Sequence, residues 1–133
     1  MTPDHVAIAK ACLAATHDGT LSFPQIIGQL IAADFEGYSV DYRRSAQSFY
    51  RQDGTSIDLA LPHTAGPVAE RFDAAEVERL IRWAQADAPD YRYTSFSGKA
   101  VAAGCAGYLV SFLGQRVVYY GRTGETHVEL FPQ

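Results

Sequence analysis

The sequence is poor in cysteine, with only two in 133 residues, Cys12 and Cys105. Both stand in alanine-rich stretches that we predict to be a buried helix and a helix end, where a thiol acts as a small apolar side chain. Two isolated cysteines do not make the disulfide framework that small secreted domains use. We therefore expect two free thiols and a reducing, cytoplasmic location.

Excess positive charge and long apolar runs are also missing. The 11 basic residues are outnumbered by 15 acidic ones, and the net charge of -4 argues against a surface that tracks nucleic-acid phosphates. No stretch approaches the ~20 apolar residues of a membrane-spanning helix, and no basic leader precedes an unbroken apolar segment at the N-terminus. We expect a protein that binds neither nucleic acid nor membrane.

Conventional catalytic and cofactor-binding motifs are absent as well. The glycines have the wrong spacing for a phosphate-binding loop, and no nucleophile elbow, HExxH or CxxC pattern occurs. The sequence therefore gives no support to a zinc site or to a familiar catalytic class. We predict no metal and no cofactor, and we favour a protein that is not an enzyme.

What the sequence does contain is an internal repeat. With a shift of 70 residues, seven identities fall in the 23 positions from 32 to 54, and Gly37-Tyr38 falls on Gly107-Tyr108. We interpret this as one structural unit written twice within a single domain that spans residues 1–133. The first repeat covers about residues 2–61, a linker covers 62–67, and the second repeat covers about 73–131.

Each repeat is predicted to contain two helices followed by three strands. Thr2 and Ser22 have the form of helix N-caps, and from Gly37 the apolar spacing changes from helical to alternating. Asp53-Gly54 predicts a tight turn, and Gly114-Gln115 predicts a type II′ turn. The expected elements lie at about residues 3–18, 23–33, 38–43, 47–51, 55–61, 74–87, 94–103, 108–112, 116–120 and 125–131.

The fold class that follows from this order is α+β. Two tandem helix-helix-three-strand repeats would join their strands into one antiparallel sheet, with the helices packed on it as a second layer. Three strands and two helices enclose little core alone, so we expect the two halves to fold together.

The chain resembles a bacterial family catalogued as a domain of unknown function, number 1398. The resemblance covers nearly the whole chain and rests on short motifs without a catalytic signature: Ser22-Phe23-Pro24, Gly37-Tyr38, Tyr50 before Asp53-Gly54, Tyr91 to Phe96, and Tyr119-Tyr120-Gly121 through Gly124-Glu125 to Glu129 and Pro132. The family includes prophage-encoded proteins, some labelled phage envelope protein. The resemblance implies a prophage-related protein and brings no established activity with it.

Glu125, His127 and Glu129 form the first candidate site. Strand periodicity places the three side chains on one face of the last predicted strand. A histidine between two carboxylates is protonated more readily, and such a trio can bind a divalent metal or move a proton. The same residues also fit the solvated face of an edge strand, where charge discourages pairing with another chain.

Four tyrosines that are related by the repeat form the second candidate site. Tyr38 matches Tyr108 and Tyr50 matches Tyr120, and a tyrosine combines an apolar body with a polar tip suited to a pocket. Asp41 is added as a candidate although it lies on the strand face opposite Tyr38. Core packing against the covering helices explains the same pattern.

The remaining histidines, His5, His17 and His63, are isolated in predicted helix or loop, and we interpret them as surface residues. The function we favour is a non-enzymatic binding or regulatory module that engages an unknown protein partner or a second copy of itself. The alternative is a small-molecule-binding protein or small enzyme that uses the Tyr/His/Glu residues. A phage-derived structural or host-takeover role follows from the resemblance alone.

Overall fold

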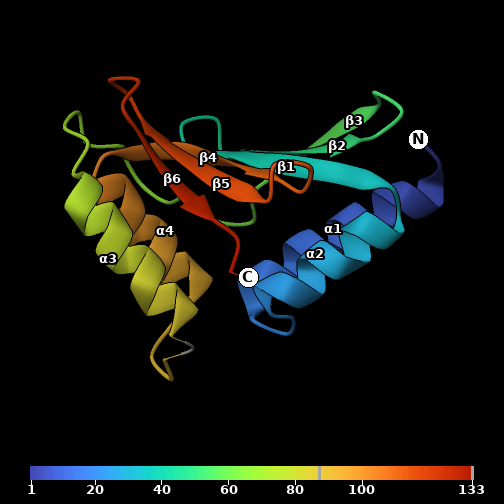
Figure 1. Ribbon diagram of the computed structural model, residues 1–133, viewed down its shortest axis with the longest axis horizontal. Coiled ribbons are helices and arrows are strands. Elements are labelled where there is room, and N and C mark those ends of the chain that lie inside the picture. Colours follow the sequence, from blue (N-terminus) through green and yellow to red (C-terminus); the bar gives the residue numbers. More distant parts are fainter. Residues whose placement is uncertain (87, 133) are drawn as a thin grey trace.

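A computed structural model describes residues 1–86 and 88–132 as four helices and six strands (Figure 1). The α+β class expected from the sequence is confirmed. The predicted helix end near residue 87 lies outside the described residues. In chain order the elements are α1 (Pro3–Asp18), α2 (Phe23–Ala32), β1 (Phe35–Asp41), β2 (Ala46–Arg51), β3 (Ser56–Ala60), α3 (Ala74–Gln85), α4 (Tyr93–Ala102), β4 (Cys105–Ser111), β5 (Arg116–Gly121) and β6 (Thr126–Leu130).

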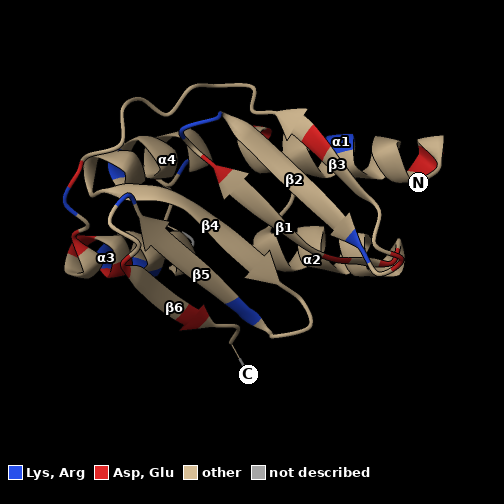
Figure 2. Ribbon diagram, turned by 90° about the horizontal axis from the view of Figure 1, so that it is seen from above, with Lys and Arg blue, Asp and Glu red and all other residues tan. Residues whose placement is uncertain are grey.

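The six strands form one antiparallel sheet in the order β3-β2-β1-β4-β5-β6. All four helices cover the same face, with α1 and α2 under one half and α3 and α4 under the other (Figure 1). Seen from above, the strands lie in front of the helices (Figure 2), so the second face of the sheet carries no covering layer among the described residues. The fold therefore has an inner face that faces the helices and an outer face that does not.

The two halves of the sheet have corresponding boundaries. The bounds of β4, β5 and β6 lie 70 residues after those of β1, β2 and β3, and α4 stands in the same relation to α2. Left-handed backbone recurs at the same interval, at Asp34 (φ 64°) and Gly104 (φ 87°) and again at Ser45 (φ 49°) and Gln115 (φ 50°). The chain thus makes the same turns at the same places in both halves.

The core lies between the sheet and the helices. Strand alternation sends every second side chain to the inner face, and the amphipathic helices meet them with apolar stripes. Both cysteines are buried and free, as predicted. The inner-face side chains of the sheet include Tyr38, Val40, Phe49, Tyr108, Val110 and Val117.

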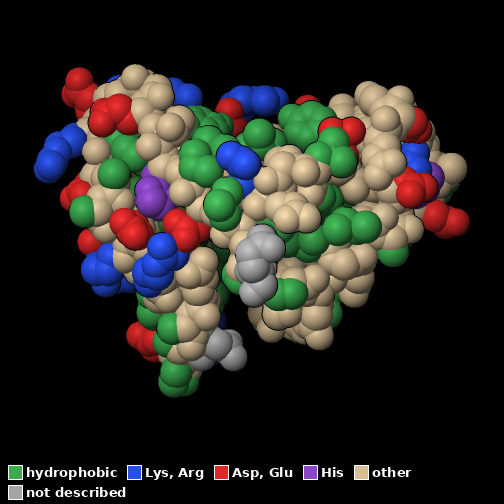
Figure 3. Space-filling view, in the orientation of Figure 1, with side chains coloured by type: hydrophobic (Ala, Val, Ile, Leu, Met, Phe, Trp, Pro, Cys, Tyr) green, Lys and Arg blue, Asp and Glu red, His purple; other side chains and the backbone are tan. Residues whose placement is uncertain are grey.

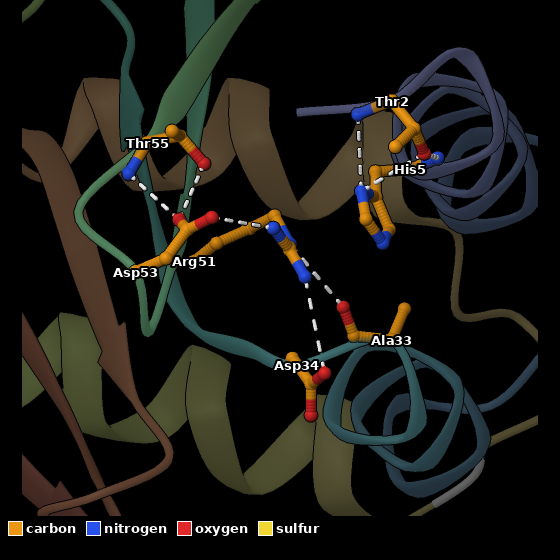
Figure 4. Close-up of polar contacts among 7 residues, drawn as sticks. All are labelled: Thr2, His5, Ala33, Asp34, Arg51, Asp53 and Thr55. Carbon is orange, nitrogen blue, oxygen red and sulfur yellow. Dashed lines mark hydrogen bonds and ion pairs between the residues drawn. The ribbon is translucent and has the colours of Figure 1, made fainter.

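Helix starts follow the predicted capping chemistry. Ser22 Oγ accepts a hydrogen bond from the Gln25 amide (3.3 Å), and Gln25 Oε1 accepts one from the Ser22 amide (2.8 Å). Thr2 forms the corresponding box with His5 (Figure 4). These reciprocal bonds satisfy amides that a helix N-terminus leaves without partners.

Arg51 connects the end of β2 to the end of α2. Its Nη1 donates to Asp53 Oδ2 (2.8 Å), its Nε donates to the carbonyl oxygen of Ala33 (3.4 Å), and its Nη2 lies 3.8 Å from Asp34 Oδ2 (Figure 4). Asp53 Oδ1 in turn accepts from the Thr55 amide (2.9 Å), which shapes the turn. The cluster is therefore a structural tie between helix and hairpin.

The corresponding place in the second half is filled by the connection between β3 and α3. Position 121 is glycine, and a Cβ there would lie 2.8 Å from the ring of Phe72. A Cβ at Gly104 would meet the carbonyl oxygen of Arg71, so this segment lies against both glycines. The linker is longer than the predicted residues 62–67, since no helix or strand occurs between Ala60 and Ala74.

Three local predictions are wrong. The turn after β4 is not type II′, because positive φ falls on Gln115 and not on Gly114. The helix expected to start at Thr94 begins at Tyr93, with Arg92 as its N-cap. The last strand begins at Thr126, because Glu125 belongs to the preceding turn, where its Oε1 accepts a hydrogen bond from Thr123 Oγ1 (2.7 Å).

Candidate functional site

The sheet separates the four repeated tyrosines into two pairs. Tyr38 and Tyr108 are buried on the inner face, where the Tyr38 ring packs against Phe49 at a centroid distance of 5.7 Å. Tyr50 and Tyr120 lie on the outer face, paired across strands with Gly37 and Gly107. The four tyrosines therefore do not surround one cavity.

The outer-face tyrosines and Asp41 make local contacts. The Tyr50 hydroxyl lies 3.2 Å from Ser39 Oγ, and the Tyr120 side chain covers Gly107 closely enough to exclude a Cβ there. Asp41 Oδ1 accepts hydrogen bonds from the Arg43 and Arg44 amides (3.0 and 3.2 Å), which closes the β1–β2 turn. This placement on the face opposite Tyr38 is the one that strand alternation predicts.

His127 and Glu129 come together, and Glu125 does not join them. His127 Nε2 lies 2.8 Å from Glu129 Oε2, and Arg82 of α3 donates to Glu129 Oε1 at 2.5 Å. Figure 3 shows a histidine beside acidic and basic side chains over this part of the surface. Within residues 1–86 and 88–132, no group of three or more His, Cys, Asp and Glu residues could hold a metal. The pair instead faces inward, toward α3, and ties β6 to that helix.

The charges around Glu129 favour its ionised form. Burial raises the pKa of this carboxyl, but the hydrogen bonds from Arg82 and His127 outweigh burial, so the net pKa lies below the usual value. The ion pair is thus a pH-dependent contact between helix and sheet.

A connected group of hydroxyls lies under the centre of the sheet. The Tyr42 hydroxyl is 3.3 Å from Ser97 Oγ and 3.4 Å from the Tyr93 hydroxyl, which is 2.5 Å from the Tyr108 hydroxyl. Burial raises the pKa of Tyr42 and Tyr108 well above the usual value, so both remain protonated donors. Burial also raises the pKa of Tyr93, while hydrogen bonds from Tyr108, Tyr42 and Ser97 act in the opposite direction.

A small cavity of about 60 Å³ opens beside this hydroxyl group. It lies where the end of α1, the start of α4, the end of β1 and the linker after β3 meet. The described residues that line it carry two imidazoles and several hydroxyls but no formal charge: His17, Tyr42, Leu61, His63, Thr64, Ala65, Thr94 and Ser97. We call it the histidine cavity.

His17 is the most unusual residue of the histidine cavity. Both of its ring nitrogens are inaccessible to solvent and have no hydrogen-bond partner among the described residues, although the side chain as a whole is only partly buried. Its ring lies 4.8 Å from the Tyr93 ring and 5.9 Å from the His63 ring, between centroids. Burial lowers the pKa of His17, and the nearby His63 lowers it further. The neutral imidazole is therefore favoured in a place where it lacks a partner.

The interpretation of His17 and His63 as isolated surface residues is wrong. The two histidines are 46 positions apart, and no spacing rule brings them together. One signal was present: His17 follows Leu13 by four residues, on the apolar stripe that also contains Ala9, so its side chain points inward. Nothing comparable marks His63, which reaches the cavity from an irregular segment.

Comparison with known proteins adds no identity. No protein-family model matches the chain, and no curated protein matches its sequence. The resemblance to the family of unknown function number 1398 therefore stays a prediction. In the described parts of the chain, none of the helices combines the length and apolar character needed to cross a lipid bilayer.

Proposed function

We propose that the protein is a non-enzymatic binding module that holds a small polar ligand in the histidine cavity. The observation that carries the proposal is the pair of His17 ring nitrogens, which are inaccessible and lack partners among the described residues. An unsatisfied buried polar group costs about 1–3 kcal/mol, and a hydrogen-bonding ligand removes that cost.

The cavity limits the size of the ligand. A volume of about 60 Å³ corresponds to roughly two water molecules at liquid density. A ligand of a few non-hydrogen atoms fits, as does the end of a longer molecule that enters through the mouth. Its polar atoms would meet the imidazoles of His17 and His63 and the hydroxyls of Tyr42 and Ser97.

Thermal unfolding with a panel of small carboxylates, oxyanions, amides and divalent metals tests this function. A ligand that binds the folded state raises the melting temperature, and its effect should be lost in Ala65→Leu, which fills the cavity and keeps both histidines. His5→Gln is the matched control, because His5 lies at the other end of α1. If no compound stabilises the wild type, or if Ala65→Leu responds equally, the proposal fails.

A second candidate function is self-association or protein binding through the outer face of the sheet. Leu109 and Val128 are 41% and 45% exposed there, and no described element covers them. Light scattering of wild type and Leu109→Lys tests it. Self-association requires a wild-type dimer that the substitution dissociates, and a monomeric wild type removes it.

Two further functions stay open to direct experiment. An enzyme that uses the inward pair of His127 and Glu129 would lose its activity in His127→Ala, and unchanged turnover in that variant removes this option. A phage-derived role has only the family resemblance in its support. Prophage genes on both sides of the coding sequence are its expected signature.

A further inference from the structure

We propose that the ligand of the histidine cavity is a small oxyanion, a carboxylate or a phosphate-type anion, and that it binds together with a proton taken up by His17 and His63. This inference rests on the proposed function and names its ligand class and its regulation. Neither the anion nor the proton uptake follows from ligand binding in general, so each can fail while the binding function stands.

The first support is the set of donors around the cavity. Tyr42, Ser97 and Thr94 present hydroxyls, and a hydroxyl proton rotates to serve an acceptor placed beside it. Tyr42 also receives support from behind, because its hydroxyl is linked to that of Tyr93. Thr94 belongs to the first turn of α4, where the helix dipole favours negative charge. Oxygen atoms of an anion would therefore find several donors.

The second support is the pair of imidazoles. No arginine or lysine lines the cavity among the described residues, so an anion there has no permanent countercharge. The countercharge must come from a histidine that gains a proton, and His17 lies in the last turn of α1, where the helix dipole favours a cation. Without an anion, burial and the charge of His63 oppose that protonation. An anion reverses the balance, which couples its binding to proton uptake.

The neighbours of His17 do not supply a competing charge. The titratable groups that face it are Tyr93 from α4, Tyr42 from the end of β1 and His63 from the linker. The neighbouring Asp18 carboxylate is engaged by Thr20, whose hydroxyl and amide both donate to Asp18 Oδ1. The histidine pair is therefore the group in this region that can respond to an anion near neutral pH.

The lining fits an oxyanion better than a metal ion. Neutral hydroxyls are weak ligands for zinc and similar metals, which prefer imidazole, thiolate and carboxylate. The cavity lining of the described residues contains neither a thiol nor a carboxylate beside its two imidazoles. The two classes also respond to pH in opposite directions, since protons compete with a metal and assist an anion.

Calorimetric titration with formate, formamide, inorganic phosphate and zinc tests the inference. Formamide has the size of formate without its charge. We expect formate or phosphate to bind about tenfold more tightly per unit of pH decrease between about pH 8 and about pH 6, with up to one proton taken up per anion. Buffers of different ionisation enthalpy measure that proton directly.

The variants separate the roles of charge and space. His17→Gln and His63→Gln should each weaken anion binding about tenfold and flatten its pH dependence, as expected when a charged hydrogen bond is lost. Ala65→Leu should abolish binding with both histidines present, and His5→Gln should match the wild type. Circular dichroism and the melting temperature establish that each variant is folded.

Every other outcome overturns the inference and bears differently on the proposed function. Formamide that binds as well as formate, or anion binding without proton uptake, leaves a binding cavity but removes the proton-linked anion. Zinc that binds more tightly at about pH 8 and requires His17 assigns the cavity to metals instead. If none of the four probes binds and the wider thermal panel is also silent, both the inference and the binding function fail.

Discussion

Ser39 and Leu109 face each other across the two central strands, and their positions differ by 70 residues. The neighbouring pairs obey the same relation, since Gly37 pairs with Ser111 and Asp41 pairs with Gly107. An antiparallel pairing of this kind places a local twofold axis between Ser39 and Leu109, perpendicular to the sheet. The side chains at the axis differ in polarity although the backbone around them corresponds.

Leu109 and Leu30 should respond very differently to truncation. Leu30 is fully buried in the core, whereas Leu109 is 41% exposed on the outer face. We expect Leu30→Ala to lower the free energy of unfolding by about 2–5 kcal/mol and Leu109→Ala to lower it by about 0.5 kcal/mol. Urea unfolding curves measure both, and equal losses would mean that the outer face is covered in solution.

Gly104 and Gly124 test the packing of the linker. Both have positive φ, 87° and 82°, but a Cβ at Gly124 meets open space while one at Gly104 meets the backbone of Arg71. Gly124→Ala should cost about 1 kcal/mol for backbone strain alone. Gly104→Ala should cost about 3 kcal/mol or more, because the Arg71-Phe72 segment must move. Similar denaturant midpoints for the two variants would contradict this packing.

Glu129 should make stability sensitive to acid. Its pKa is lowered in the folded protein, so its contribution is present above the unfolded value of about 4.3 and is lost as pH falls through the folded value. We expect Glu129→Gln to cost about 1–2 kcal/mol near neutral pH and much less near pH 3. Glu78→Gln is the control, because Glu78 meets the same Arg82 on an exposed surface. A constant difference across this pH range would exclude the ion pair.

His17 should weaken the fold in mild acid. Its pKa is lowered in the folded state, so the unfolded chain binds the proton more readily, and stability falls as pH drops through the unfolded value of about 6.5. His17→Gln should flatten the stability profile between about pH 7 and pH 5. Proton-detected titration of the four imidazoles measures the same effect directly. A His17 ring that titrates at or above its ordinary value is incompatible with the buried environment.

Tyr93 should matter more than Tyr50 although each loses only a hydroxyl as phenylalanine. The Tyr93 hydroxyl connects those of Tyr42 and Tyr108 in the core, whereas the Tyr50 hydroxyl contacts Ser39 on the outer face. We expect Tyr93→Phe to cost about 1–3 kcal/mol, since a buried hydroxyl is left without its partner. Tyr50→Phe should cost about 0.5 kcal/mol or less. Comparable losses in denaturation would argue against a connected hydroxyl group.

The elements could be predicted because their determinants are local. Ser22 and Gln25 form a capping box within one turn, and the alternation of Tyr38, Val40 and Tyr42 identifies both the strand and its buried face. The error at Gly114 and Gln115 shows the limit of turn chemistry, because the hairpin places a non-glycine residue in the left-handed region.

The candidate site could not be predicted because it is assembled from distant segments. His17, His63 and Ser97 come from a helix end, an irregular connection and a second helix, and only the path of the connection brings them together. The predicted trio failed for a smaller reason. Its first member, Glu125, lies one residue before β6 begins, so strand periodicity no longer applied to it.

The central pairing of β1 with β4 sets the order in which the chain is expected to fold. Among the described strands it is the pairing that joins strands not adjacent along the chain, whereas the other four pairings are hairpins between consecutive strands. Hairpins close short loops and form early, but the β1–β4 ladder must first bring segments about 70 residues apart together. Each half can therefore acquire its meander quickly, and the rate at which the native sheet appears depends on how often two partly ordered halves meet in the right register.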